Sequence, residues 1–438
     1  MFTILICKIL CFIGEKLGRG SSLPGQIALK LDPNILSKIK MPETVVAVTG
    51  SNGKTSLSEM LRVCAKQAGK RVVCNSEGSN QIEGVTTALL KSCSLKKEVQ
   101  ADVAILESDE RFCQYTFRHF APSHIVVTNL FRDQLTRNGN SEFVLGEVKK
   151  GLPASSRLIL NADDPVSASL GYNRNDVLYY CVEPDAIKET EQRSHAYDDG
   201  AFCPVCKSKM SYKWRIFSHL GSYYCKNCGF KRGDAAHSVT SVKDGEFVLD
   251  KKYSVKPQLL NNVFAYNLAA AFTVATEVFS LSPEETAAAL TGYKLTNERI
   301  REFSVNGHKG LFLLSKHENS ISYDSSLSTI VNSEGKEKTV VLIVDLLSRK
   351  YIANDMSWLW DIDFNLLSDE RIKNIIVSGG FANDLAARLI FSGVNQEVLT
   401  VEPDLDKMMN TLYQTAVGDV FVMTCFTDVN KFTKRLRA

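Results

Sequence analysis

Short apolar runs alternate with helical patterns along the first part of the chain. The runs Val45–Val48, Val103–Leu106, His124–Thr128 and Leu158–Leu160 have the character of buried strands. Between the first two, Leu57–Ala68 repeats its apolar residues at the spacing of one helical face. Strands that alternate with helices in this way are typical of a mostly parallel sheet covered on both faces. We therefore predict an α/β fold.

The pattern changes twice further along the chain. Glu183–Asp250 is polar, rich in Tyr and interrupted by Cys, which indicates an insertion with its own small module. Asn267–Phe279 then predicts an Ala-rich helix, and Ser282 is a good cap for the helix after it. A second α/β pattern follows, and its expected strands are Thr339–Val344, Asn374–Val377 and Val420–Thr424.

These patterns divide the chain into a lead segment (residues 1–40), a middle α/β domain (41–300) and a second, Rossmann-like α/β domain (301–438). The inserted module is expected at about residues 200–235 of the middle domain.

The lead segment opens with an apolar stretch, Met1–Leu17, that superficially resembles a secretory signal. Lys8 interrupts the stretch, the basic region of a signal is missing, and no small-residue cleavage site follows cleanly. We therefore favour an amphipathic helix that is buried or grazes a membrane. No apolar run reaches the ~18–20 residues of a membrane-spanning helix. The expected location is cytoplasmic, with contact to the inner face of the membrane left open.

Composition narrows the class of protein. The 438 residues carry 52 Lys and Arg against 49 Asp and Glu, a formal charge of +3, with 44% hydrophobic and 23% charged residues. This balance is ordinary for a soluble globular protein. The near-neutral charge argues against a dedicated nucleic-acid binder.

The first apolar run ends in a glycine-rich loop that leads into the predicted helix. Strand, loop and helix in this order form a phosphate-binding unit, because backbone N–H groups and the helix N-terminus attract phosphate oxygens. Gly50, Asn52 and Gly53 would form the loop of an ATP site. Lys54 would reach the terminal phosphates, and Thr55 would coordinate Mg²⁺.

A carboxylate follows the second apolar run. Glu107 lies just after Val103–Leu106, at the edge where doubly wound sheets bind ligands. We predict that it holds Mg²⁺ directly or orients one of the ligands of the ion. Asp109 and Glu110 are close by, and they could share this role or be solvated loop charges.

Four of the 12 Cys residues form two CxxC pairs, Cys203–Cys206 and Cys225–Cys228. Four thiolates at this spacing suit tetrahedral Zn²⁺, and two disulfides or free thiols are the alternative. Because all four positions are Cys, no position is left for water, and the predicted zinc is structural.

These motifs together resemble the MurT family. Thr49–Ser56 is similar to the ATP loop of Mur ligases, and a four-Cys ribbon inserted in the ATPase domain marks MurT proteins. Leu17–Gly25, Thr128–Leu135 and Asp355–Asp361 are also similar to MurT segments. The resemblance implies a Mur ligase-like P-loop ATPase domain with an inserted zinc ribbon, followed by a MurT-type C-terminal domain.

The resemblance also implies an activity: the ligase subunit of lipid II isoglutaminyl synthase, an ATP-dependent carbon–nitrogen ligase of peptidoglycan synthesis. Such a subunit activates the α-carboxylate of D-glutamate in the lipid II stem peptide as an acyl phosphate, which ammonia converts to D-isoglutamine. The implied partner is a GatD-type glutamine amidotransferase in a heterodimer. The implied cofactors are ATP, Mg²⁺ and structural Zn²⁺, and no nucleic acid is involved.

Three further residues take roles from the resemblance. Asp355 matches the family position proposed to complete the Cys-His pair of the partner across the interface. The alternative is that Asp355 caps a helix. Asn267 and Arg299 match residues that bind the adenine end of the nucleotide and reach it from the domain junction, and each could instead be structural.

The chain departs from the family pattern mainly where the two domains join. Phe264 replaces an asparagine, and Glu298–Arg301 keeps only the arginine of a Gly-Arg-x-Glu segment. Lys316–Glu318 stands in place of Lys-Asn-Pro, and Leu347–Asn354 replaces an asparagine-rich run. Because substrate should lie here, two alternatives stay open: a Mur-type ligase for another carboxylate, and an ATP-binding scaffold for an amidotransferase with little turnover.

Overall fold

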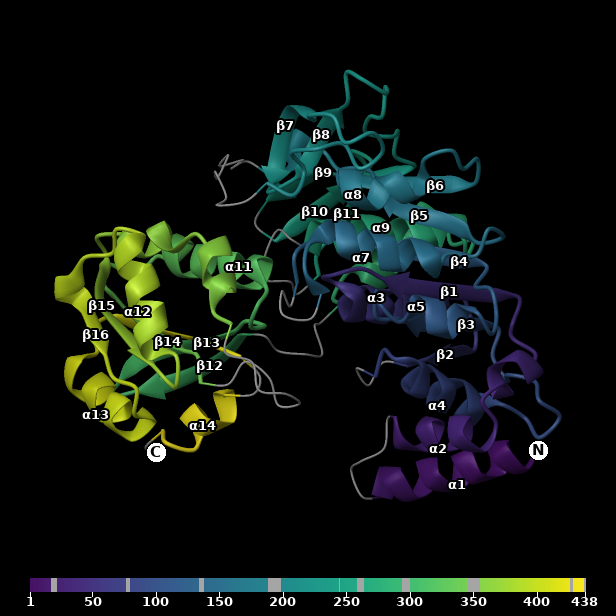
Figure 1. Ribbon diagram of the computed structural model, residues 1–438, viewed down its shortest axis with the longest axis horizontal. Coiled ribbons are helices and arrows are strands. Elements are labelled where there is room, and N and C mark those ends of the chain that lie inside the picture. The colour runs from purple at the N-terminus through teal and green to yellow at the C-terminus, as the bar shows by residue number, and fades with distance from the viewer. Residues whose placement is uncertain are drawn as a thin grey trace. The chain divides into compact units, whose positions relative to one another are not determined.

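The computed structural model describes residues 1–16, 22–75, 79–133, 138–187, 198–243, 245–257, 264–293, 300–345, 355–425 and 428–436. They fall into two compact units (Figure 1). The first unit contains a nine-stranded sheet and a two-stranded sheet, and its described residues end at Tyr293. The second contains a six-stranded sheet, and its main part begins at Ile300.

The large sheet of the first unit has the order β11-β10-β9-β6-β5-β4-β1-β3-β2. All pairs from β9 to β2 are parallel, and only β10 and β11 run antiparallel to their neighbours. The strands are β1 (Thr44–Thr49), β2 (Val72–Cys74), β3 (Val103–Glu107), β4 (His124–Val127), β5 (Arg157–Asn161), β6 (Val177–Val182), β9 (His237–Lys243), β10 (Glu246–Leu249) and β11 (Tyr253–Val255).

Helices cover both faces of this sheet, as its central strands require, because β1 and β3 are buried on both sides. One face of the sheet is covered by a group of helices that pack against one another: α3 (Lys54–Gln67), α9 (Phe264–Glu277) and α10 (Pro283–Leu290). Within this group, α3 contacts β3, and α9 contacts β6 and β9. Ser282 caps α10 through a complete capping box with Glu285, as predicted. Helices packed against the opposite face are α4 (Ile82–Ser92), α5 (Cys113–Phe117), α7 (Ser141–Lys150) and α8 (Pro165–Ala168). The 3-10 turns are η1 (Ile35–Lys38), η2 (Ser169–Gly171) and η3 (Pro184–Ala186).

The lead segment forms two helices, α1 (Phe2–Lys16) and α2 (Leu23–Leu31), which lie side by side next to α4 (Figure 1). Gly25 makes the close packing possible, since a Cβ there would lie 1.9 Å from the Glu83 carbonyl oxygen. The predicted amphipathic helix is present: α1 buries Ile4 and Cys7 and exposes its other face. Among the described helices, none is both long and apolar enough to cross a membrane.

The insertion between β6 and β9 carries a hairpin of β7 (Ser211–Phe217) and β8 (Leu220–Tyr224). A buried carboxylate after β5, Asp163, hydrogen-bonds to it, and a second, Asp164, lies close to it. The Arg232 Nε donates to Asp163 Oδ1 at 2.6 Å, and the His219 Nε2 lies 3.2 Å from Asp164 Oδ1. Burial raises the pKa of the Asp163 carboxyl to about 6, although the Arg232 guanidinium opposes that rise.

The sheet of the second unit has the order β12-β13-β17-β14-β15-β16, parallel except for β12. Its strands are β12 (Ile300–Val305), β13 (His308–Leu314), β14 (Lys338–Ile343), β15 (Ile372–Ser378), β16 (Leu399–Val401) and β17 (Asp419–Thr424). One face packs against α11 (Ser320–Asn332), η4 (Ser357–Asp361), η5 (Phe364–Ser368) and α12 (Ala382–Phe391). The other packs against α13 (Leu405–Thr415) and α14 (Val429–Thr433), and η6 (Gln396–Val398) precedes β16. All seven strands predicted from the apolar runs are present.

Candidate functional site

The glycine-rich loop joins the carboxyl end of β1 to the first turn of α3. Gly53 precedes the helix with φ +86°, and Gly50 has φ +124°, conformations that favour glycine. The loop also lies close to its neighbours, because a Cβ on Gly50 would meet Thr128 Oγ1 at 2.3 Å. The backbone N–H of Ser51 donates to the Asn129 carbonyl at 2.8 Å, which ties the loop to the residues after β4.

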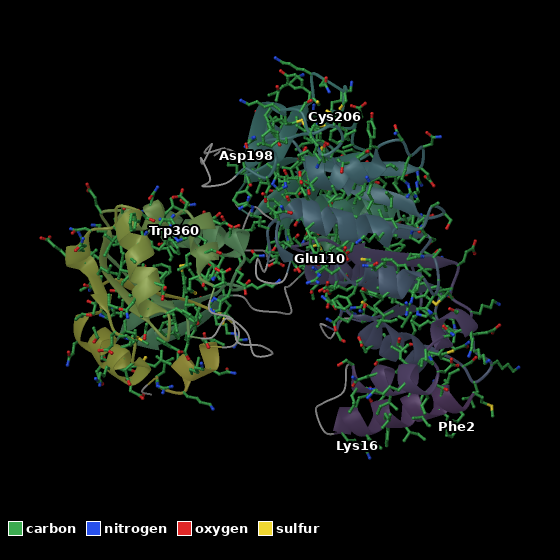
Figure 2. The ribbon with its side chains drawn as sticks, in the orientation of Figure 1. Phe2, Lys16, Glu110, Asp198, Cys206 and Trp360 are labelled. Atoms are coloured by element: carbon green, nitrogen blue, oxygen red, sulfur yellow. The ribbon has the colours of Figure 1, made fainter. Side chains whose placement is uncertain are left out.

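The Lys54 ammonium lies among oxygens of its own loop and of the loop after β3. Its Nζ donates to the carbonyl oxygens of Gly50 and Ser51 and pairs with Glu110 Oε2 at 3.0 Å. Glu110 is labelled in Figure 2. Glu110 and Asp109 are only 2% and 5% exposed. The interpretation of these two acids as solvated loop charges is therefore wrong, since both are buried beside the phosphate loop.

The Thr55 hydroxyl and the Glu107 carboxylate meet at the same edge of the sheet. They meet because β1 and β3 pair with Val48 opposite Glu107, and the Thr55 Oγ1 donates to Glu107 Oε2 at 2.9 Å. The amide of Asn80 donates to the other carboxylate oxygen at 3.1 Å, while Asn75 hydrogen-bonds both backbone groups of Glu107. A hydroxyl and a carboxylate in contact are ligands that suit Mg²⁺.

Asn267 comes from the first turn of α9 and reaches the same loop. Its Nδ2 donates to the Gly53 carbonyl at 3.2 Å. The loop is braced on its other side by Asn129, whose side chain exchanges hydrogen bonds with the backbone of Asn52 at 3.0 and 3.2 Å. The structure thus gathers six predicted residues of the first unit, while the assignment of Asn267 to the adenine end stays a prediction. The six are Gly50, Asn52, Gly53, Lys54, Thr55 and Glu107.

Asp355 belongs to the second unit, and Arg299 lies outside the described residues. Asp355 is exposed, and its Oδ1 accepts a hydrogen bond of 2.9 Å from the Ser357 N–H at the start of η4. This hydrogen bond lowers the pKa of the Asp355 carboxyl. The N-cap position of η4 is Met356, so Asp355 does not cap this turn from that position, and its catalytic role stays a prediction. The surface beside it forms a depression lined by Asp355, Ser357, Trp360, Asp384 and Arg388, among others.

The four clustered thiols converge in the insertion, where Cys206 is labelled in Figure 2. The Sγ atoms of Cys203 and Cys228 are 3.7 Å apart. Those of Cys206 and Cys225 are 3.5 Å apart. Sulfur atoms around a tetrahedral ion with Zn–S bonds of about 2.3 Å would be separated by about 3.8 Å. The donor set therefore fits zinc.

Comparison with known proteins adds the family. The Mur ligase middle domain matches residues 48–229, and the MurT ligase C-terminal domain matches residues 316–429. The lipid II isoglutaminyl synthase (glutamine-hydrolyzing) subunit MurT of Staphylococcus aureus (strain COL) is 31% identical over 395 residues, which cover 89% of this chain and 86% of that protein. This chain belongs to the MurT family. The predicted resemblance is confirmed, as is the prediction of an ATP-dependent ligase related to Mur ligases.

A second relative agrees with MurT membership, and a solved structure agrees with the fold. The subunit MurT of Streptococcus pneumoniae (strain ATCC BAA-255 / R6) is 28% identical over 449 residues, covering 97% of this chain and 94% of that protein. A pseudomurein peptide ligase type C from Methanothermus fervidus superposes with a TM-score of 0.69 at 20% identity, covering 91% and 79% of the two chains. That structural likeness confirms a Mur ligase-like α/β fold with parallel sheets and a C-terminal domain.

Sequence reasoning missed several residues around the phosphate loop of this MurT protein. Asn75, Asn80 and Asn129 all hold the loop or Glu107. Asn129 lies in the MurT-like segment Thr128–Leu135, but no role was predicted for it, and Asn75 and Asn80 belong to no recognisable motif. Their one common signal is position, because Asn75 and Asn129 each follow closely on a strand of the same sheet. For Asn75, this position can be recognised only when β2 is assigned, and the three residues of β2 are too few to show a strand pattern.

We predict that Gly53→Ala destabilises the chain by more than the about 1–2 kcal/mol that a positive φ costs an L-residue. The reason is steric, since the new Cβ would lie 2.5 Å from Asn267 Oδ1. Urea unfolding followed by circular dichroism measures the difference. Gly69→Ala is the matched control, with φ +69° and open space around its Cβ. Adding Asn267→Ala should recover the excess cost of Gly53→Ala, and equal costs for the two alanine variants would contradict the steric argument.

Proposed function

We propose that this protein is the MurT-type ligase subunit of a lipid II isoglutaminyl synthase, active in peptidoglycan synthesis. The observation that carries the proposal is the 31% identity that spans 86% of a subunit MurT. The contact between Thr55 and Glu107, with Lys54 alongside, supports it chemically, because a nucleotide-dependent ligase needs these groups at one edge of a sheet. The substrate is the α-carboxylate of D-glutamate in the lipid II stem peptide.

The reaction follows from the weakness of a carboxylate as an electrophile. A carboxylate oxygen of D-glutamate attacks the γ-phosphorus of ATP, the bond from that phosphorus to the bridging oxygen breaks, and ADP leaves. Ammonia then attacks the carbonyl carbon of the acyl phosphate, the bond to the phosphate oxygen breaks, and the ammonia nitrogen gives up a proton.

The residues of this chain serve the first of these steps. Lys54 would offset the negative charge that develops on the transferred phosphoryl group. Thr55 and Glu107 would hold Mg²⁺, which would supply positive charge against the phosphates. Gly50 and Gly53 would let the loop turn so that backbone N–H groups at the start of α3 face the phosphates.

The source of ammonia would be a GatD-type glutamine amidotransferase bound to the second unit. Two exposed aromatic rings support a docking surface near Asp355: Trp360 and Phe391 are 50% and 76% exposed, and their centroids are 5.5 Å apart. Trp360 also lies under the Arg388 guanidinium, 5.0 Å from its ring centroid (Figure 2 labels Trp360). Tryptophan and arginine are enriched among the residues that dominate interface energies.

We predict that Asp355→Asn abolishes amidation of lipid II with glutamine but leaves amidation with ammonium salt unchanged. The carboxylate would orient the histidine of the partner, so its loss would stop ammonia release without touching the ligase step. The measurement is mass spectrometry of lipid II after incubation with ATP, Mg²⁺ and the co-expressed complex.

Asp404→Asn is the control for that experiment, because Asp404 is also exposed, accepts a hydrogen bond from the Asp406 N–H, and lies at the start of α13 on the opposite face of the sheet. It should amidate with both nitrogen sources. No wild-type product with either source would overturn the proposed substrate and favour another carboxylate or a scaffold. Loss of both activities in Asp355→Asn would place Asp355 in the ligase step.

The four thiols would hold a structural Zn²⁺, since the ribbon offers four sulfur ligands and no position for water. We predict that Cys206→Ser removes one zinc ion per chain and lowers the midpoint of thermal unfolding by at least several degrees. Elemental analysis and calorimetry measure both. Cys64→Ser, which removes a buried thiol from α3, is the control for loss of a thiol alone. Unchanged zinc content in Cys206→Ser would contradict the assignment.

We propose a cytoplasmic protein that meets the membrane of its lipid-linked substrate through α1. The outer face of this helix, whose ends Phe2 and Lys16 are labelled in Figure 2, exposes apolar side chains. Phe2 and Phe12 are 69% and 59% exposed. The remaining exposed apolar residues of this face are Leu5, Ile9 and Ile13.

We predict that Ile9→Glu with Phe12→Glu weakens binding to anionic phospholipid vesicles at least tenfold, because each side chain contributes roughly 1.5–3 kcal/mol when buried. Vesicle co-sedimentation of the full chain measures this. Leu95→Glu is the control, an exposed apolar residue outside α1. Equal sedimentation of wild type and double variant would show that α1 does not bind lipid.

A further inference from the structure

Three potential metal ligands meet in the second unit, apart from the zinc ribbon. His317 follows β13, Cys425 follows β17, and Asp428 precedes α14. They meet because β13 and β17 pair in parallel with Leu314 opposite Thr424, so that both strands end at the same edge of the sheet. This edge is where open α/β sheets bind ligands.

The distances among the three ligand atoms suit one ion. His317 Nε2 and Cys425 Sγ each lie 3.6 Å from Asp428 Oδ2, and all three atoms lie within 4.8 Å of one another. Tetrahedral zinc with bonds of about 2.0–2.3 Å separates its ligands by about 3.3–3.8 Å. Two of the three separations therefore already match, and the distance from His317 to Cys425 is at most 4.8 Å.

The orientation of the imidazole is that of a metal ligand. His317 Nδ1 lies 2.9 Å from the Tyr323 hydroxyl, so the ring can donate its Nδ1–H there and turn the Nε2 lone pair toward Cys425 and Asp428. Within the described part of the chain, this buried Nε2 makes no hydrogen bond. Histidines that bind metals almost always fix their second nitrogen in this way.

Burial and charge agree with a divalent ion. His317 and Cys425 are each 5% exposed, and Asp428 is fully buried. As ligands, the Cys425 thiolate and the Asp428 carboxylate bring two negative charges into a site with little water. The nearby pair of Lys431 and Asp345 is neutral as a whole, and Lys431 also contacts Asp428 Oδ1 at 3.0 Å. A doubly charged cation would compensate the remaining charge.

We propose that His317, Cys425 and Asp428 form a second metal site, which binds Zn²⁺ or a similar divalent transition-metal ion. Imidazole, thiolate and carboxylate are the ligands that zinc takes in proteins. The ion would tie the ends of β13 and β17 to the start of α14. The proposal does not depend on the substrate of the ligase.

Metal content of the purified full chain tests the proposal. After equilibration with excess Zn²⁺ and removal of unbound ion, elemental analysis should find about two zinc ions per wild-type chain, one in the ribbon and one here. His317→Gln and Cys425→Ser should each contain about one. The controls His308→Gln and Cys181→Ser, which remove a histidine from β13 and a buried thiol from β6, should keep both ions.

A cobalt titration keeps the test valid if a variant folds poorly. Wild-type protein stripped of metal and titrated with Co²⁺ should show two equivalents of tetrahedral cobalt in its visible spectrum. In Cys206→Ser, the equivalent that remains should disappear when Cys425→Ser is added. One equivalent of either metal in the wild type, or equal content in Cys425→Ser and Cys181→Ser, would overturn the proposal.

Discussion

The site in the first unit depends on the parallel pairing of β1 with β3. That register places Val48 opposite Glu107, so a hydroxyl from the helix after one strand meets a carboxylate at the end of the next. The main-chain hydrogen bonds of the sheet fix both strand ends. Asn75 adds to this rigidity, because it holds the backbone of Glu107 on both sides. Catalytic geometry is most precise when it rests on such elements.

The same constraint organises the second unit. β13 and β17 are neighbours in space although more than a hundred residues separate them in the sequence, and their parallel register gathers His317 and Cys425 at one edge. Most of the remaining surface of this sheet is occupied by packing, with Trp358 and Phe364 buried among the helices of one face. In both units, candidate ligand residues therefore gather where parallel strands end, which is where open α/β sheets bind ligands.

Sequence could predict the features that are local. The strand, loop and helix around Lys54 follow one another directly in the chain, and the two CxxC pairs each fit within one turn. Both motifs can therefore be recognised without knowledge of the fold. The burial of Glu110 could not be predicted in this way, because it depends on how the loop after β3 packs against Lys54. His317 and Cys425 form no pattern along the chain. Their contact requires β13, a strand that the apolar runs did not reveal.

The ion pair between Lys54 and Glu110 has a consequence for nucleotide recognition. Glu110 is almost fully buried, so a triphosphate that approaches Lys54 would compete with that carboxylate for the ammonium. The selectivity of the loop for its ligand would then depend on this competition for the Lys54 ammonium. A weakly charged anion could not displace Glu110 from Lys54, whereas a polyphosphate with a bound cation could. The ion pair of Lys54 and Glu110 would thus require a ligand to carry enough negative charge to compete with a buried carboxylate before it can bind the loop.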